Sequence, residues 1–294
     1  MKFSKNFQKT KGQLTSIYPE YPISNRCLTI LCGKTGSGKS AWVKKIINEV
    51  VEPIVENTKV VFISPTVDLD ELMNDEDVKP IEETNSILKS IMTYKKQEKT
   101  VKNHFKTLCN FYDVLNENDY KMIKLKKKDR TIQLSPMAEE FRIFYTKNKK
   151  YLDYDDPTIL EMRDKCKSFC LVFDDCAGQE VLKDGSELTK FIMTRRHYHT
   201  SIFLAVQYFK QLIPKVRAQT SDIVVFQGIR KETLKDIYNE VCHEAVGDNE
   251  KLFNSLIKKH VVDGPKYSHI CFMMNGCDDK PHIMANYDLN ELVK

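Results

Sequence analysis

Residues 27–40 read Cys-Leu-Thr-Ile-Leu-Cys-Gly-Lys-Thr-Gly-Ser-Gly-Lys-Ser, a short apolar run that passes directly into a glycine-rich loop. The apolar run, Cys27–Cys32, has the composition of a buried β-strand, and apolar residues at helical spacing follow the loop from Trp42 to Val50. The loop, Gly33–Ser40, fits the pattern G-x4-G-K-[S/T], in which backbone N–H groups of the turn and of the next helix cradle phosphate groups. The sequence therefore predicts a phosphate loop between a strand and a helix.

The phosphate loop gives its side chains expected roles. We expect Lys39 to reach the β- and γ-phosphate oxygens of a nucleoside triphosphate and Ser40 to offer its hydroxyl to Mg²⁺. The nucleotide-binding residues expected on this basis are Gly33, Lys34, Thr35, Gly36, Ser37, Gly38, Lys39, Ser40 and Ala41.

Further apolar runs alternate with helical patterns, which is typical of a parallel sheet covered by helices. The expected strands are Val60–Ile63, Phe169–Phe173, Ile202–Val206, Ile223–Phe226, His269–Met274 and His282–Ala285, and the expected helices lie near residues 185–196, 208–218 and 231–242. The fold class predicted is α/β, a P-loop NTPase fold (RecA/ASCE-like) with a mostly parallel central sheet flanked by helices. We expect an N-terminal arm at residues 1–25 and a P-loop domain at 26–294, with a large, mainly helical, basic insertion at about 66–165.

Two adjacent acids follow the strand predicted at Phe169–Phe173. A phosphate loop needs a carboxylate at the end of a second buried strand to orient its metal ion, and Asp174 is expected to do this. Asp175 lies one residue further on, where a carboxylate can orient and deprotonate the attacking water.

Polar residues also flank the strand predicted at Ile202–Val206. Gln207 ends it, and in phosphate-loop ATPases with a strand between the two acid-bearing motifs such a residue contacts the γ-phosphate. Charge that develops on the transferred phosphoryl group needs a cation, which Arg217 is expected to supply to a neighbouring subunit. Arg195 and Arg196 precede the strand and are interpreted as surface arginines, and His197 and His199 are interpreted as helix-end residues.

Charge is concentrated in one part of the chain. Residues 91–150 hold 15 Lys and Arg against 7 Asp and Glu, whereas the whole chain has a net charge of +5. This block indicates either a solvated charged insertion or a contact with a polyanion. Within the block, residues 121–130 read KMIKLKKKDR.

Composition excludes some classes of protein. No apolar run approaches the ~18 residues that a membrane-spanning helix needs, so we expect no membrane association. The start of the sequence lacks the apolar stretch of a secretory signal. Nine cysteines at irregular spacings indicate buried thiols in a reducing compartment, and we expect no metal at Cys166 and Cys170.

Two other functions are open at this point. The segment Asp175-Cys-Ala-Gly-Gln179 resembles the D-x-A-G-Q switch of small GTPases, which would make the chain a nucleotide-gated switch, although no N-K-x-D motif for guanine occurs in the sequence. A small-molecule kinase is the other alternative, but the acid pair and Gln207 suit water activation better than an acceptor pocket.

Taken together, the segments GKTGSGKS, KVVFISPT, LVFDD, TRRHYHTSIFLAVQ and IPKVRAQTSDIVVF resemble the genome-packaging ATPases of large DNA viruses and virophages. These ATPases form the poxvirus-type branch of the FtsK–HerA superfamily. The resemblance covers about residues 26–240, with gaps in the insertion. It implies a multimeric ring that hydrolyses ATP with Mg²⁺ to push double-stranded DNA into a preformed capsid, and the alternative within this resemblance is another ATP-driven DNA transaction. A motor that moves along DNA needs phosphate contacts that do not read sequence, and residues 121–130 are the candidate for a channel-facing loop that makes them. The implied partners are double-stranded DNA, further copies of the chain and a capsid or portal protein, in the host cytoplasm (virus factory) or in the virion.

The resemblance also carries over to individual residues. Those that match the family's motifs are Gly33, Gly38, Lys39 and Ser40 (nucleotide loop), Asp174 and Asp175 (metal and water), Gln207 (sensor) and Arg217 (arginine finger). Asp175 departs from the wider superfamily, which often has Glu there. The insertion is too diverged to align, so no DNA-contacting residue is carried over.

Overall fold

A computed structural model gives the fold, and it describes residues 26–48, 58–65, 78–152, 156–165, 167–176, 178–274 and 282–285. The chain divides into two compact units. One consists of the residues up to Lys89 together with those from Ser168 onward, and the other is the segment Ser90–Lys167. The first is called the sheet unit here and the second the helical unit.

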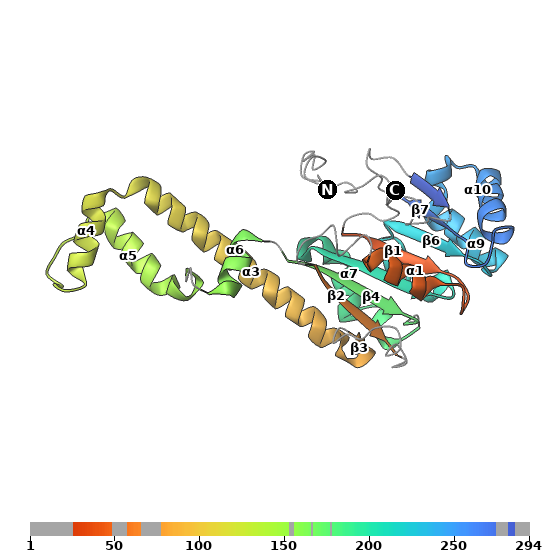
Figure 1. Cartoon of the computed structure of the whole chain (residues 1–294), viewed down its shortest axis with the longest axis horizontal. Coiled ribbons are helices and arrows are strands. Elements are labelled where there is room, and N and C mark those ends of the chain that lie inside the picture. The colour runs from red at the N-terminus through yellow and green to blue at the C-terminus, as the bar shows by residue number, and fades with distance from the viewer. Residues whose placement is uncertain are drawn as a thin grey trace. The chain divides into compact units, whose positions relative to one another are not determined.

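Eight strands of the described residues form one sheet in the sheet unit (Figure 1). They are β1 (Leu28–Cys32), β2 (Thr58–Ser64), β3 (Val78–Pro80), β4 (Ser168–Asp174), β5 (Thr200–Val206), β6 (Asp222–Phe226), β7 (His269–Met273) and β8 (His282–Ala285). Their order is β3-β2-β4-β5-β1-β6-β7-β8, parallel from β3 to β6 and antiparallel from there on. The prediction of a mostly parallel central sheet is confirmed.

The position of β5 explains why the predicted residues meet. It lies between β1, which leads into the phosphate loop, and β4, which ends in the acid pair. The register pairs Cys32 with Val206 and Asp174 with Ala205, so the carboxyl ends of the three strands are level with one another. A crevice at the carboxyl ends of parallel strands is where open α/β sheets bind their ligands. This strand order, with the phosphate loop after β1, defines a P-loop NTPase fold, as predicted.

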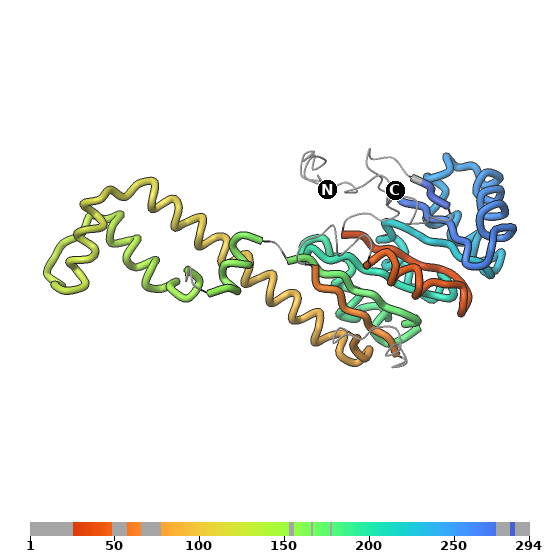
Figure 2. The backbone as a smooth tube through the Cα atoms, in the orientation of Figure 1, coloured from red at the N-terminus to blue at the C-terminus, as the bar shows by residue number. Residues whose placement is uncertain are grey.

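Helices cover the sheet, as the sequence predicts. Those of the sheet unit are α1 (Lys39–Ile46), α7 (Glu187–Thr194), α8 (Pro214–Arg217), α9 (Lys231–Ile237) and α10 (Glu250–Ile257). The apolar side of α1, with Trp42, Val43 and Ile46, joins the core formed by β1, β5 and β6. Figure 2 shows α1 running along β1, the strand that precedes it. The loop between them is therefore fixed at both ends by buried elements.

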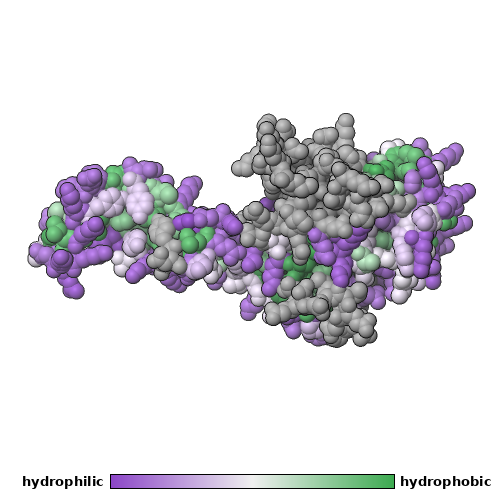
Figure 3. Space-filling model, viewed as in Figure 1, coloured by the Kyte–Doolittle hydropathy of each residue, from purple (hydrophilic) through white to green (hydrophobic). Residues whose placement is uncertain are grey.

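The helical unit has a core of its own. Its helices are α3 (Thr84–Val114, which begins in the sheet unit), α4 (Glu117–Lys126), α5 (Pro136–Asn148) and α6 (Pro157–Asp164). Asn116, Ser135 and Asp156 cap the last three helices through their side chains. Apolar and aromatic side chains such as Phe105 and Phe141 pack between the helices. Hydrophilic side chains cover most of the visible surface of this unit (Figure 3).

Some elements differ from the sequence prediction. Strand β3 lies inside the range expected for the insertion, yet it pairs with β2 and belongs to the sheet unit. The helix predicted at 231–242 is α-helical only to Ile237 and continues as a π-helical turn to Cys242. Helix α10 has no counterpart in the prediction. The arm predicted at 1–25 lies outside the described residues, and so does Cys166.

Candidate functional site

Two glycines, Gly33 and Gly38, fix the shape of the phosphate loop. The Gly33 N–H donates to the Val206 carbonyl of β5 at 3.2 Å. A Cβ at Gly33 would lie only 2.6 Å from Ser37 Oγ and 2.7 Å from Phe226 Cβ, so this position admits no side chain. Gly38, directly before α1, has a left-handed φ of 96°, which glycine adopts without steric cost. The loop therefore has a fixed curvature that depends on its glycines.

Lys39 turns back into the loop that precedes it. Its side chain is buried, and its Nζ donates to the carbonyls of Gly33 at 2.7 Å and Lys34 at 3.0 Å. Burial lowers the pKa of Lys39, and the nearby carboxylates of Asp174 and Asp175 oppose that shift. The ammonium group thus sits inside the loop, on the side that also holds the two acids.

The remaining loop residues lie where the motif requires. Lys34, Thr35, Gly36 and Ala41 are exposed, and Ser37 is buried. Ser37 Oγ finds no hydrogen-bond partner among the described residues. A buried hydroxyl without a partner in the same loop as a buried lysine ammonium suits a ligand that carries acceptor oxygens. The loop therefore fits a phosphate chain.

Ser40 and Asp174 meet directly. The Ser40 Oγ–H donates to Asp174 Oδ2 at 2.5 Å, although 134 positions separate the two residues. One hydroxyl and one carboxylate on the open edge of the sheet are the protein ligands that Mg²⁺ takes when phosphates and water complete its shell. The two residues predicted to hold the metal ion are thus brought together, and their oxygen atoms fit it.

Asp175 and Gln207 form a second pair beside the first. Gln207 Nε2 donates to Asp175 Oδ1 at 3.2 Å across the ends of β4 and β5. Asp175 has a left-handed φ of 52° and is exposed, so its carboxylate stands clear of the strand. Strained backbone at a sheet edge is typical of functional sites.

The next residue, Cys176, has a buried and unreactive thiol. Its buried Sγ–H donates to the Ile63 carbonyl at 3.5 Å. Burial, with the neighbouring Asp174 and Asp175, raises the pKa of Cys176 to about 12. The thiol is therefore neutral at physiological pH and is no nucleophile.

Arg217 has a partner within its own chain. Its guanidinium donates to both carboxylate oxygens of Glu240, at 2.6 and 3.2 Å, and its Cζ lies 5.5 Å from the centre of the Phe209 ring. The structure therefore gives Arg217 an anchoring contact, and its role as an arginine finger for a neighbouring subunit stays a prediction.

The segment before β5 is structural in part. Arg195 is 1% exposed and donates to the carbonyls of Ile192 and Gln219 and to Ser221 Oγ. Residues Arg195–Tyr198 form a 3₁₀ turn that ends at His199, which confirms the helix-end interpretation of His197 and His199. The surface position predicted for Arg195 is wrong, because its guanidinium is buried against these three acceptors.

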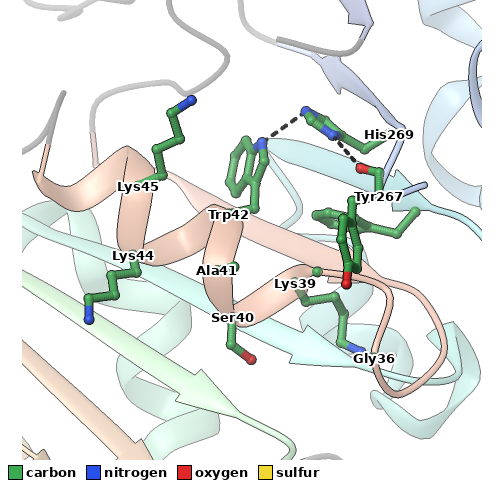
Figure 4. Close-up of a pocket in the computed structure, with 11 residues that line it drawn as sticks. Gly36, Lys39, Ser40, Ala41, Trp42, Lys44, Lys45, Tyr267 and His269 are labelled. Atoms are coloured by element: carbon green, nitrogen blue, oxygen red, sulfur yellow. Dashed lines mark hydrogen bonds between the residues drawn. The ribbon is translucent and has the colours of Figure 1, made fainter. Parts of the chain in front are cut away.

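A cavity of about 560 Å³ adjoins the phosphate loop (Figure 4). Loop residues line one part of it, and the other part is lined by Trp42, Lys44 and Lys45 of α1 with Phe226, Tyr267 and His269. The Trp42 Nε1–H donates to His269 Nε2 at 3.0 Å, which joins α1 to β7. Sequence reasoning missed this cavity because 227 positions separate these two residues. The sequence feature that could have indicated the cavity is Trp42, the single tryptophan of the chain, which follows the loop closely.

Two searches within the described residues are negative. None of the described helices has the length and apolar character needed to cross a membrane. The described residues contain no group of three or more His, Cys, Asp and Glu side chains arranged to hold a metal ion.

Comparisons with known proteins give only distant likenesses. No protein-family model matches the sequence, and no curated protein matches it. The genome packaging NTPase B204 of Sulfolobus turreted icosahedral virus 2, in complex with AMPPCP, is 14% identical with a TM-score of 0.42, and the match covers 90% of this chain and 97% of that chain. The DNA-packaging ATPase B204 of Sulfolobus turreted icosahedral virus is 12% identical with a TM-score of 0.42, with 89% and 98% covered. EssC (ATPases 2 and 3) of Geobacillus thermodenitrificans is 12% identical with a TM-score of 0.38, with 68% and 32% covered. At this level of similarity these structures carry no argument about the function of this chain.

Proposed function

We propose that this chain is an ATP-hydrolysing motor that translocates double-stranded DNA and packages a viral genome into a preformed capsid. The observation that carries the proposal is the contact of Ser40 with Asp174 at 2.5 Å, next to the pair of Asp175 and Gln207. A phosphate loop, a metal-holding pair and a water-orienting pair at one sheet edge form the set that triphosphate hydrolysis needs.

The residues of the site divide the tasks of this reaction among them. Lys39 and the loop hold the phosphate chain, and Ser40 and Asp174 would hold Mg²⁺, which would neutralise phosphate charge. Asp175 accepts a proton from a water whose oxygen bonds to the γ-phosphorus, while the bond from that phosphorus to the ADP oxygen breaks. Gln207, hydrogen-bonded to Asp175, orients the carboxylate and detects the γ-phosphate.

The DNA contact is placed in the helical unit. Lys124, Lys127 and Lys128 are exposed at the end of α4, whereas Lys126 faces Glu139 of α5 at 3.7 Å. Lysines that contact phosphates bind any sequence, and a motor that moves along DNA needs this property. Neighbouring copies in a ring, with Arg217 as the arginine finger, and a capsid or portal protein complete the proposed assembly.

Release of inorganic phosphate from ATP tests the proposal. We expect the wild-type chain with Mg²⁺ to release phosphate and double-stranded DNA to increase the rate. Lys39→Ala removes the ammonium that holds the phosphates and should abolish turnover. The control is Lys190→Ala, since Lys190 is exposed and pairs with Glu187 in its own helix turn; it should behave as wild type.

The outcomes separate this function from the alternative. Phosphate release that DNA does not affect, by a chain that stays monomeric with nucleotide and DNA, would contradict the motor and support a nucleotide-gated switch. An oligomer measured by mass in the presence of an ATP analogue and DNA would support the motor.

A further inference from the structure

We propose that the cavity beside the phosphate loop binds the purine base of the nucleotide, and that the base stacks on the ring of Tyr267. This inference rests on the proposed function, because the base is placed by a triphosphate held on the loop. It adds a recognition residue, Tyr267, that lies far along the chain from the phosphate-binding motif whose residues line the same cavity.

The cavity is continuous with the phosphate loop. Gly36, Gly38, Lys39 and Ser40 of the loop line the same cavity as Tyr267 and the start of α1. A volume of about 560 Å³ is in the range of small-molecule sites. In Figure 4, Tyr267 lies next to Gly36 and Lys39, while Lys44 and Lys45 extend from α1. A nucleotide whose phosphates bind the loop therefore has room for its sugar and base only a short distance away.

The second observation is the conformation of Tyr267 itself. It has a left-handed φ of 70°, which bulky residues rarely adopt, and its side chain is 51% exposed. The ring lies so close to the loop that a Cβ at Gly38 would be 3.2 Å from Tyr267 Cδ1. Lys266 Nζ lies 4.7 Å from the ring centre. Strain that places a half-exposed aromatic ring against a phosphate loop indicates a function for that ring.

The third observation concerns the polar groups of the cavity. The side chains of the described residues that line it include neither a carboxylate nor an amide. The indole N–H of Trp42 is used by His269 Nε2, and His269 Nδ1 faces the Tyr267 carbonyl at 3.3 Å. Burial lowers the pKa of His269, so the ring is neutral at pH 7. The two contacts just named engage both of its nitrogens. The lining therefore offers aromatic rings for stacking together with the donor groups of Lys44 and Lys45, but neither of the side-chain types, carboxylate or amide, that would tell adenine from guanine.

Trp42 makes the site directly measurable. It is the only tryptophan of the chain and lines the cavity, so its fluorescence reports binding without any need for turnover. We would titrate the full chain with ATP, GTP and inorganic tripolyphosphate, the last of which has phosphates but no base. The variants are Tyr267→Gly, which removes the ring and relieves the left-handed strain, and Tyr267→Phe, which keeps the ring. Thermal unfolding of each variant checks that it is folded.

We expect Tyr267→Gly to bind ATP and GTP about 10-fold more weakly, as loss of one stacked base predicts, and tripolyphosphate with unchanged affinity. Tyr267→Phe should bind like wild type, and ATP and GTP should differ by less than about 10-fold. Unchanged ATP affinity in Tyr267→Gly, or an equal loss for tripolyphosphate, would overturn the base site and leave the proposed function intact. If the wild-type chain binds neither ATP nor tripolyphosphate, the proposed function itself is overturned.

Discussion

Asp175 combines two properties that rarely occur together in one residue. Its backbone is left-handed, and its carboxylate accepts a hydrogen bond from Gln207 at the open end of β4. Asp and Asn are the non-glycine residues that tolerate this backbone best. The position thus admits a substitution that removes the charge and keeps the fold.

We expect Asp175→Asn to bind ATP with wild-type affinity and to hydrolyse it about 10²- to 10⁴-fold more slowly, the size of a lost general base. The amide keeps an acceptor oxygen for Gln207 but cannot take a proton from water. Calorimetric titration with ATP and phosphate release would measure the two effects. The matched control is Asp184→Asn, which removes an exposed carboxylate that pairs with Lys215; its rate should not change. Full hydrolysis by Asp175→Asn would assign the base role to another residue.

The sequence predicts which residues meet at the carboxyl edge of the sheet where a motif links them to a strand. Asp174 and Ser40 follow from this logic, since parallel strands bring their carboxyl ends to one edge. The hydrogen bond between Asp175 and Gln207 could not be predicted, because it depends on the order of β1, β5 and β4 in the sheet. For Arg217 the sequence motif predicts an arginine finger, but it does not reveal the ion pair with Glu240, which appears only in the structure.

At the level of elements, β7 contacts α1, the helix that follows the phosphate loop, although the two elements are far apart in the sequence. Its first residue, His269, is buried and accepts a hydrogen bond from Trp42 of α1. The order of elements along the chain gives no sign of this contact. The prediction placed β7 correctly from its apolar run, but three-residue β3 was missed because Val78–Pro80 offers too few residues for a strand pattern. Helix α10 was missed because no motif drew attention to residues 243–268.

The buried His269 predicts how stability depends on pH. Its folded pKa is lowered chiefly by burial, so the unfolded chain binds the proton more readily. The stabilisation from neutral His269 is complete above the unfolded pKa of about 6.5 and is lost as the pH falls through the lower folded value. We expect the free energy of unfolding of the wild type to fall as the pH drops below about 6.5, by up to about 1.4 kcal/mol per pH unit from this group, until the lower folded pKa is passed.

Chemical denaturation at several pH values would measure this effect. His269→Gln keeps an acceptor for Trp42 but cannot be protonated, and it should show a shallower loss of stability on acidification than the wild type. Parallel pH profiles for the two chains would show that His269 is not the group responsible.

At the scale of the whole molecule, the chain combines a sheet unit that holds the nucleotide residues with a helical unit that carries much of the positive charge. Residues 91–150 hold 15 Lys and Arg and 7 Asp and Glu. The helical unit has its own core around Phe105 and Phe141, so its charged surface can change without disturbing the nucleotide site.

We therefore expect the triple change Lys124→Gln, Lys127→Gln and Lys128→Gln to weaken DNA binding and DNA-stimulated ATP turnover while basal turnover is unchanged. Lys126 is left in place because it faces Glu139. If each lysine contacts one phosphate, the slope of log affinity against log salt should fall by about 3. The corresponding triple change to Arg keeps the charge and should keep the stimulation. Unchanged stimulation and salt slope in the Gln variant would remove these lysines from the DNA contact.

The crystal structure of Asp175→Asn with ATP and Mg²⁺ tests most directly whether the phosphate loop and the acid pair form one hydrolytic site. We predict an intact triphosphate along Gly33–Ser40, with Mg²⁺ held between its oxygens, Ser40 Oγ and Asp174, and a water next to residue 175. A nucleotide bound elsewhere, or a metal ion that touches neither Ser40 nor Asp174, would contradict the proposed site and the function based on it.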